Sequence, residues 1–155
     1  GRRGRVSGGL LMRVGRPLVL QADRHTLWKV VSDPDRDPDF VPNLERWGTV
    51  TEGPAEIGSR YTVHWKIGAA PVGGVIELVE SDAARDLAWT SITGVSLRGR
   101  FRLRDAGDNR TKVTFRLSYQ APGGLLGLLA DRIAAGQVGR TLSTSLRNLR
   151  ELVEA

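Results

Sequence analysis

The chain of 155 residues contains no cysteine and only two histidines, His25 and His64. The absence of cysteine excludes a disulfide framework and a thiol nucleophile. No Ser-His-Asp arrangement, histidine metal cluster or phosphate-binding glycine loop can be recognised. No apolar run approaches the roughly 20 residues of a membrane-spanning helix, and the N-terminal stretch lacks the sustained apolar core of a signal peptide. We therefore expect a cytoplasmic protein, and we expect no cofactor.

Lysine is scarce as well, since only three of the 23 basic residues are lysine, and the net charge is +6. A basic surface favours nucleic acid, anionic membranes or acidic ligands as partners. Heavy use of arginine is also typical of proteins from high-GC genomes, which explains the charge without a function. Residues 1–12 contain several of the arginines, and we expect them to form a disordered arm ahead of a single domain at residues 13–155.

Four aspartates alternate with other residues in the segment VVSDPDRDPDFVPNL, residues 30–44. A calcium loop starting at Asp33 would need glycine at its sixth position and glutamate at its twelfth, where this sequence has Pro38 and Leu44. We therefore expect no metal site. The segment is better interpreted as a turn between two short helices, in which Asp33 stops the first helix and Asp37 caps the second. Phe40 and Val41 would then point to the core.

The remaining pattern predicts one sheet and one long helix. A first strand is expected at residues 16–22 and a helix at 23–33, with Asp23 as its N-cap. Period-two alternation predicts six further strands, at residues 46–52, 59–67, 71–81, 85–92, 96–105 and 112–120, with a hairpin turn at AGDNRT. Such alternation is typical of antiparallel strands with one wet face. Residues 125–154 read as a long amphipathic helix.

These elements predict an α+β fold: a seven-stranded antiparallel sheet curled around the C-terminal helix, with two short helices between strands 1 and 2. The element order, together with LWKVVSDPDRDPDFVPNLERW, IGSRYTV, LAWTSITG, RGRFRLR and TKVTFRLSYQAPGGLLG, resembles the helix-grip superfamily. That superfamily includes birch-pollen-allergen-like proteins, START-type lipid-transfer domains and polyketide cyclase/dehydrase proteins, and the chain looks most like bacterial members of the last group. The resemblance implies a cavity for a hydrophobic small molecule but no shared catalytic machinery.

Inward positions of the strands and of the long helix are the candidate ligand-binding residues. They are Tyr61, Val63, Trp65, Ile76, Leu78, Trp89, Phe101, Phe115, Leu117, Tyr119, Leu128, Ala135, Val138 and Leu142. For any single one of them, packing as an ordinary core residue is the favoured interpretation, and it is as a set that they indicate a pocket. The hydroxyl groups of Tyr61 and Tyr119 and the indole N–H groups of Trp65 and Trp89 are candidate polar anchors. The catalytic residues are unknown, with Tyr61, Tyr119 and Asp131 as the candidate acids or bases.

Three functions remain open at this point. The first is binding or transfer of a lipid, isoprenoid or polyketide, and the second is a polyketide cyclase or dehydratase. The third is a regulatory or toxin-like protein that acts on RNA or the ribosome through an arginine-rich strand face at Arg98, Arg100, Arg102 and Arg104. Nucleic acid is disfavoured, because no aromatic residue is interleaved with these arginines. An anionic membrane surface is an alternative partner beside the apolar segment 122–130, and the protein is expected to be a monomer or a homodimer.

Overall fold

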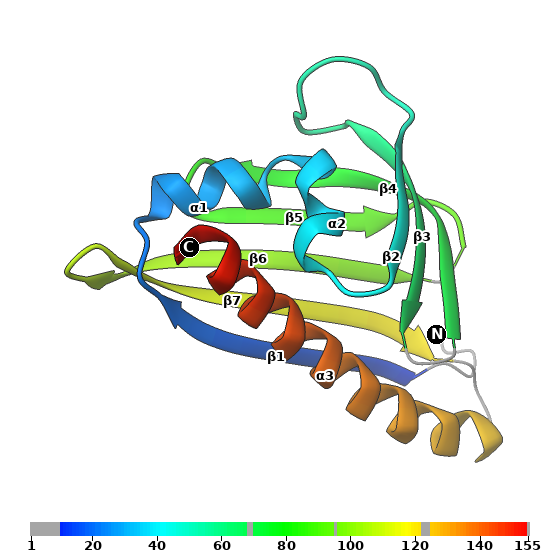
Figure 1. The fold of residues 1–155 in the computed structure, drawn as a ribbon. Coiled ribbons are helices and arrows are strands. Elements are labelled where there is room, and N and C mark those ends of the chain that lie inside the picture. The colour runs from blue at the N-terminus through cyan, green and yellow to red at the C-terminus, as the bar shows by residue number, and fades with distance from the viewer. Residues whose placement is uncertain (1–9, 68–69, 95, 122–124, 155) are drawn as a thin grey trace, which may run out of the picture.

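A single antiparallel sheet of seven strands wraps around one side of the long C-terminal helix (Figure 1). The computed structural model describes residues 10–67, 70–94, 96–121 and 125–154. The strands are β1 (Leu10–Leu20), β2 (Leu44–Thr49), β3 (Arg60–Ile67), β4 (Ala70–Asp82), β5 (Asp86–Ser91), β6 (Leu97–Gly107) and β7 (Arg110–Ala121). They lie in the order β1-β7-β6-β5-β4-β3-β2, so the first two strands of the chain occupy opposite edges. This is the helix-grip arrangement that the sequence predicts.

The long helix α3 (Leu125–Glu154) lies along β1 and β7 and buries one stripe of side chains against them. Val138, Leu142, Leu146 and Leu149 form the described part of that stripe, and all four are buried. Near the helix C-terminus, the backbone N–H of Gln21 donates a hydrogen bond of 2.7 Å to a carboxylate oxygen of Glu154. The apolar face of the predicted amphipathic helix therefore packs against the part of the sheet formed by β1 and β7.

The short helices between β1 and β2 cover the opposite part of the concave face (Figure 1). Helix α1 (Arg24–Val31) begins as predicted, because the Asp23 side chain accepts a 2.7 Å hydrogen bond from the N–H of Thr26. A 3₁₀ turn, η1 (Pro34–Arg36), follows and is capped by Asp33, whose carboxylate accepts from the Asp35 N–H. Helix α2 (Asp37–Phe40) comes next.

Asp37 does not cap α2, and that prediction is wrong. Arg36 occupies the N-cap position without a capping side-chain bond, while Asp37 is the first residue of the helix and is buried. Asp37 lies on the same helix face as Phe40 and Val41, three and four positions later, and both of these pack in the core. The Asn148 side chain donates a 3.0 Å hydrogen bond to the Phe40 carbonyl, which fastens α2 to α3.

Two local features of the strands refine the sequence prediction. Strand β1 begins at Leu10, so residues 10–12 pair with β7 instead of belonging to the expected arm, and residues 1–9 lie outside the described residues. The AGDNRT hairpin is a two-residue turn between β6 and β7. Its central residues, Asp108 and Asn109, both have positive φ, at 53° and 59°, as the twist of a tight hairpin requires.

Candidate functional site

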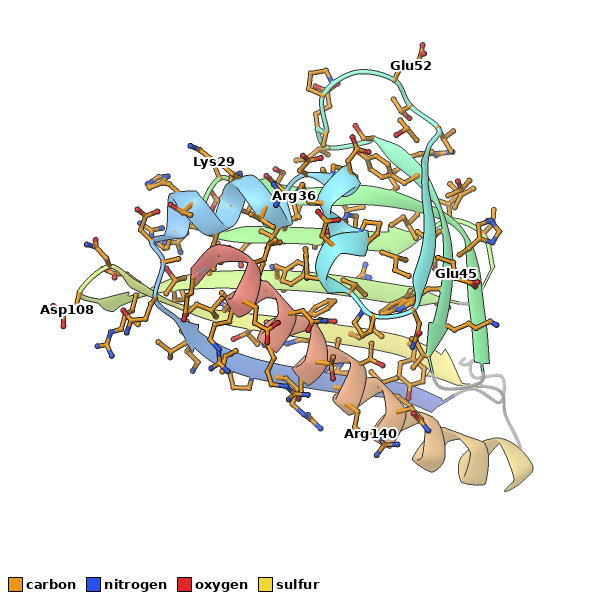
Figure 2. All side chains as sticks on the ribbon, viewed as in Figure 1. Lys29, Arg36, Glu45, Glu52, Asp108 and Arg140 are labelled. Carbon is orange, nitrogen blue, oxygen red and sulfur yellow. The ribbon has the colours of Figure 1, made fainter. Side chains whose placement is uncertain are left out.

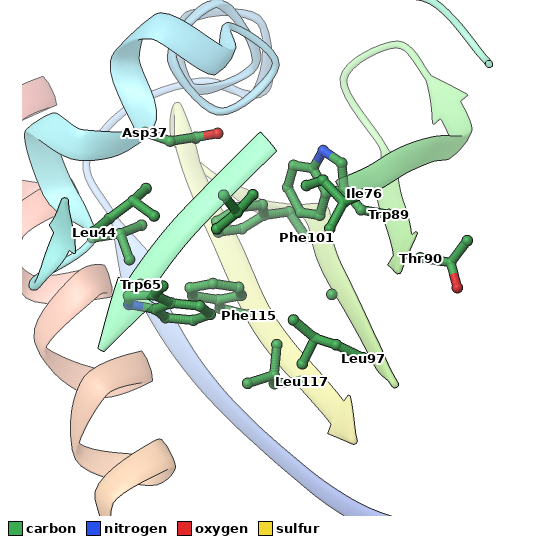
Figure 3. A pocket seen from close by; sticks show the side chains of 13 residues that line it. Asp37, Leu44, Trp65, Ile76, Trp89, Thr90, Leu97, Phe101, Phe115 and Leu117 are labelled. Carbon is green, nitrogen blue, oxygen red and sulfur yellow. The ribbon is translucent and has the colours of Figure 1, made fainter. Parts of the chain in front are cut away.

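An apolar cavity lies between the concave face of the sheet and α2 (Figure 3). Its walls are Asp37, Val41, Leu44, Val63, Trp65, Ile76, Trp89, Thr90, Leu97, Gly99, Phe101, Phe115 and Leu117. Its volume is about 60 Å³, which is space for about four water molecules. Pockets for drug-sized ligands measure roughly 300–1,000 Å³. A ligand with an aromatic ring or a lipid chain would therefore have to move side chains that now fill the space, since a cavity that holds benzene measures about 150 Å³.

Aromatic rings form the centre of this wall. Phe101 stacks on Phe115 with ring centroids 4.2 Å apart, and it meets the Trp89 ring edge-to-face at 5.7 Å. Phe40, from α2, approaches Phe101 at 6.0 Å. The rings from α2, β5, β6 and β7 thus contact one another through Phe101, which is fully buried. Such contacts hold large rigid surfaces in place at small entropic cost.

Trp65 is held in position by a hydrogen bond to the protein itself. Its indole N–H donates a bond of 3.1 Å to the Pro42 carbonyl, just after α2. The prediction that this N–H orients a ligand oxygen is therefore wrong for Trp65. The indole ring remains part of the cavity wall and is fixed there by the loop between α2 and β2.

Among the described residues that line this apolar wall, Asp37 is the one with an ionisable side chain. Its side chain projects from α2 toward the cavity (Figure 3) and only 3% of the residue is exposed. Its Oδ1 atom is buried and makes no hydrogen bond with any described residue. Burial raises the pKa of Asp37 well above its ordinary value, and the negative charges of Asp33, Asp35 and Asp39 raise it further. The site therefore favours a neutral carboxylic acid, which is a hydrogen-bond donor as well as an acceptor.

The three candidate acids from the sequence lie elsewhere. Tyr61 is buried beside the cavity, next to a space of about 10 Å³ that Asp37, Leu78 and Trp89 also line. Burial raises the pKa of Tyr61, while a hydrogen bond with Ser59 opposes that shift. Tyr119 is partly buried and packs against the core without lining the cavity. The side chain of Asp131 lies outside the described part of the structure.

The structure brings together only some of the residues predicted to bind a ligand. Seven of them line the cavity, namely Val63, Trp65, Ile76, Trp89, Phe101, Phe115 and Leu117. Leu78 and Tyr61 lie next to it. Val138 and Leu142 are buried in the interior but do not reach its walls. The side chains of Leu128 and Ala135, and the apolar segment 122–130, lie outside what the structure describes.

Sequence reasoning missed Asp37 and Val41 from α2 and its C-terminal end, Leu44 at the start of β2, and Thr90 and Leu97 from β5 and β6. A signal for Asp37 was present. Phe40 and Val41 are predicted to face the core, and a residue three or four positions earlier on a helix shares their face. The cavity also reaches the backbone of β6 at Gly99, where a side chain would project toward Trp89 and Leu117.

The outer face of the sheet is less basic than its sequence indicates. Arg100, Arg102 and Arg104 all form ion pairs with one carboxylate, Asp86, at 3.4, 3.6 and 3.3 Å. Arg100 also bonds Glu80 at 2.6 Å. Two carboxylates, Glu80 of β4 and Asp86 of β5, therefore offset part of the positive charge of the predicted arginine-rich face.

Other charged side chains lie at the periphery of the molecule. Figure 2 shows Lys29 and Arg140, for example, pointing away from the space between sheet and helices. Within the described ranges, no three His, Cys, Asp or Glu side chains lie close enough together to hold a metal ion. No described helix is long and apolar enough to cross a membrane.

Comparison with known proteins identifies a family and a fold. A family model described as polyketide cyclase/dehydrase and lipid transport matches residues 14–154. The structure is similar to the Zhui aromatase/cyclase from Streptomyces sp. R1128, with a TM-score of 0.79 and 18% identity over 94% of each chain. A START superfamily protein from Mycobacterium smegmatis gives a TM-score of 0.74 at 15% identity, over 92% of this chain and 97% of that one.

A plant enzyme shares the fold as well. Norcoclaurine synthase from Thalictrum flavum, solved in complex with dopamine and hydroxybenzaldehyde, gives a TM-score of 0.68 at 14% identity, over 99% of this chain and 97% of that one. No curated protein sequence matches the chain. At these identities the solved structures establish the fold alone.

Proposed function

Because the chain belongs to the polyketide cyclase/dehydrase and lipid transport family, we propose that it binds a hydrophobic small molecule of the lipid, isoprenoid or polyketide class between the sheet and the helices. The observation that supports this proposal is the apolar cavity with its cluster of aromatic rings. Burying ~200 Å² of apolar ligand surface there is worth ~5 kcal/mol before the losses of association. Affinity would therefore come mainly from the aromatic and aliphatic wall.

The small volume of the cavity constrains how such a ligand binds. A fused-ring or lipid ligand is larger than the cavity volume of about 60 Å³, so residues of the wall must move when it binds. The part of the wall that lies outside the hydrogen-bonded sheet is α2, a four-residue helix fastened to α3 by the bond from Asn148 to the Phe40 carbonyl. We expect ligand entry to displace α2 and its neighbouring loop while the sheet keeps its register.

Gly99 offers a direct test of the cavity. A β-carbon at Gly99 would lie 3.3 Å from the Trp89 ring and 3.8 Å from a methyl carbon of Leu117. Gly99→Val therefore places a branched side chain in the cavity, and we expect it to weaken binding of the neutral probe N-phenyl-1-naphthylamine at least tenfold. Probe fluorescence in a titration measures the affinity.

Gly15→Val is the matched control for this experiment. It makes the same change in β1, where the described atoms nearest to the added carbon belong to the Arg116 side chain and the Phe115 backbone, at ordinary distances of 3.8 Å or more. Equal affinities in the two variants would contradict binding in this cavity. Native mass spectrometry of the gently purified protein, followed by extraction under denaturing conditions, then identifies the natural ligand.

A second candidate function is a polyketide cyclase or dehydratase. The observation that favours it is a carboxyl group, Asp37, buried in the wall of an apolar cavity, since a neutral acid in such a site can protonate a carbonyl oxygen during ring closure or dehydration. Turnover of a linear poly-β-ketone thioester, lost in Asp37→Asn while probe binding is kept, would favour this enzyme over a carrier. Spontaneous transfer of a bound lipid between vesicles would favour the carrier.

A further inference from the structure

We propose that Asp37 is the polar anchor of the cavity: its buried carboxyl group donates a hydrogen bond to a carbonyl oxygen of the bound ligand. The inference rests on the proposed function, because it concerns the same cavity. It narrows the ligand class from any hydrophobic molecule to a neutral, carbonyl-bearing one. It also predicts that carboxylates of similar shape are excluded.

The position of Asp37 is set by the helix that carries it. Phe40 and Val41 anchor α2 in the core, and Asp37 shares their face, so its side chain is directed inward with them. The surrounding wall is aliphatic and aromatic, with Val41, Leu44 and Val63 among its members. The carboxyl group is thus held at one end of an apolar space by elements packed on both sides of it.

The carboxyl group has a hydrogen-bonding capacity that the described protein does not use. Asp37 forms no ion pair with a described residue, and its Oδ1 atom has no described hydrogen-bond partner. Buried polar atoms in native proteins are nearly always bonded, so an unbonded oxygen on a residue that lines a cavity points to a bond made with something absent from the protein chain. A ligand oxygen placed in the cavity would supply that partner.

The charges around Asp37 decide which ligand group fits. On its own segment Asp33, Asp35 and Asp39 are negative, and Arg36 is engaged by Asp39 at 3.0 Å. From the sheet, the neighbouring titratable group is the Tyr61 hydroxyl, which is neutral below its raised pKa. From helix α3, the side chain that bonds α2 is the uncharged Asn148, which donates to the Phe40 carbonyl. A ligand carboxylate would meet negative charge without a compensating cation, whereas a ketone accepts a bond from the neutral acid.

Three naphthalenes of similar shape test this selectivity: 2-acetylnaphthalene, 2-ethylnaphthalene and 2-naphthoate. Their dissociation constants are measured by quenching of tryptophan fluorescence at pH 6, for the full chain. We expect the ketone to bind about fivefold more tightly than the ethyl compound, which is the range of one net hydrogen bond, and the carboxylate to bind most weakly. In Asp37→Leu the ketone and the ethyl compound should bind equally.

Two further variants serve as controls for the experiment with Asp37→Leu. Asp37→Asn keeps a donor of the same shape, and we expect it to retain the preference for the ketone. Glu52→Gln removes an exposed carboxylate that is not among the charges around Asp37, and we expect it to behave as the wild type. Far-ultraviolet circular dichroism verifies that each variant is folded.

The possible failures are distinguishable. If the naphthalenes bind the wild type without preference, or if Asp37→Leu keeps the preference, the anchor is refuted while the proposed function stands. If 2-naphthoate binds most tightly, the charge argument is refuted. A stronger preference for 2-(aminomethyl)naphthalene than for the ketone would make Asp37 a counterion for amines and overturn the carbonyl class. If none of these compounds binds, the proposed function fails for aromatic ligands and the anchor fails with it.

Discussion

Replacing Asp37 should stabilise the ligand-free protein, although the residue is almost completely buried. A buried polar group that has lost its partners costs about 1–3 kcal/mol, and Asp37 has an unbonded Oδ1 in an apolar wall. Asp37→Leu removes that penalty and adds apolar contact of similar volume. At pH 7 we expect its free energy of unfolding to exceed that of the wild type by about 1–3 kcal/mol.

The difference in free energy of unfolding between the Asp37 variants and the wild type should increase with pH. The folded-state pKa of Asp37 is raised above the unfolded value of roughly 3.9, so the folded protein holds this proton more tightly than the unfolded chain. The wild type therefore loses stability as the pH rises from about 4 to the folded-state pKa, by ~1.4 kcal/mol for each pH unit within that window. Asp37→Asn cannot ionise and should lack this loss, so its advantage over the wild type should grow from pH 4 upward.

Urea denaturation followed by tryptophan fluorescence at pH 4, 5, 6 and 7 measures these differences. Subtracting the wild type from each variant cancels the titration of the carboxyl groups that do not interact with Asp37. Glu52→Gln serves as the control, because Glu52 is exposed, carries no ion pair with a described residue and is not among the charges that raise the pKa of Asp37. The reasoning is refuted if Asp37→Asn differs from the wild type by a constant amount at every pH, or if Asp37→Leu is less stable than the wild type at pH 7.

Two other substitutions test the framework around the cavity. Gly94 has φ of +82°, and an added β-carbon would lie 2.1 Å from the Gly73 carbonyl oxygen. We therefore expect Gly94→Ala to lower the free energy of unfolding by ~2 kcal/mol or more. An unchanged urea midpoint would contradict the close approach of β4 to the loop that contains Gly94. Asp86→Asn leaves three guanidinium groups without their shared carboxylate. Because those arginines are 32–42% exposed and can be solvated, we expect a loss of only about 1 kcal/mol, which should shrink in 1 M salt; a loss that salt leaves unchanged would show that screening is not involved.

The fold was predictable because each strand carries its own signal. Tyr61, Val63 and Trp65 alternate with polar residues, so the sequence shows both that the segment is a strand and which face is buried. The helix stripe at Leu142, Leu146 and Leu149 is similarly explicit. The order of the elements then leaves one sheet and one long helix to pack against each other.

The candidate cavity was harder to predict, because it depends on which part of the concave face each helix covers. Leu142 points inward as predicted, but α3 covers β1 and β7, so this side chain seals the core there and does not reach the cavity. The cavity lies under α2 instead. Asp37 was missed because an aspartate beside a proline at a helix start has the usual pattern of a solvated cap. The signal against that pattern is the predicted inward direction of Phe40 and Val41, which share a helix face with Asp37 and are buried in the structure.

The strand order has a consequence for how the chain reaches this structure. Strand β1 hydrogen-bonds only to β7 in the sheet, with Leu20 opposite Thr111, and the Thr111 hydroxyl donates a 2.7 Å bond to the Ala22 carbonyl. During synthesis, β1 therefore leaves the ribosome before its partner β7 has been made, and it stays unpaired until the other strands have been synthesised. Contacts so distant in sequence are slow to form. The nascent chain must keep an apolar strand unpaired throughout that interval, which makes this edge the one most exposed to mispairing with other chains.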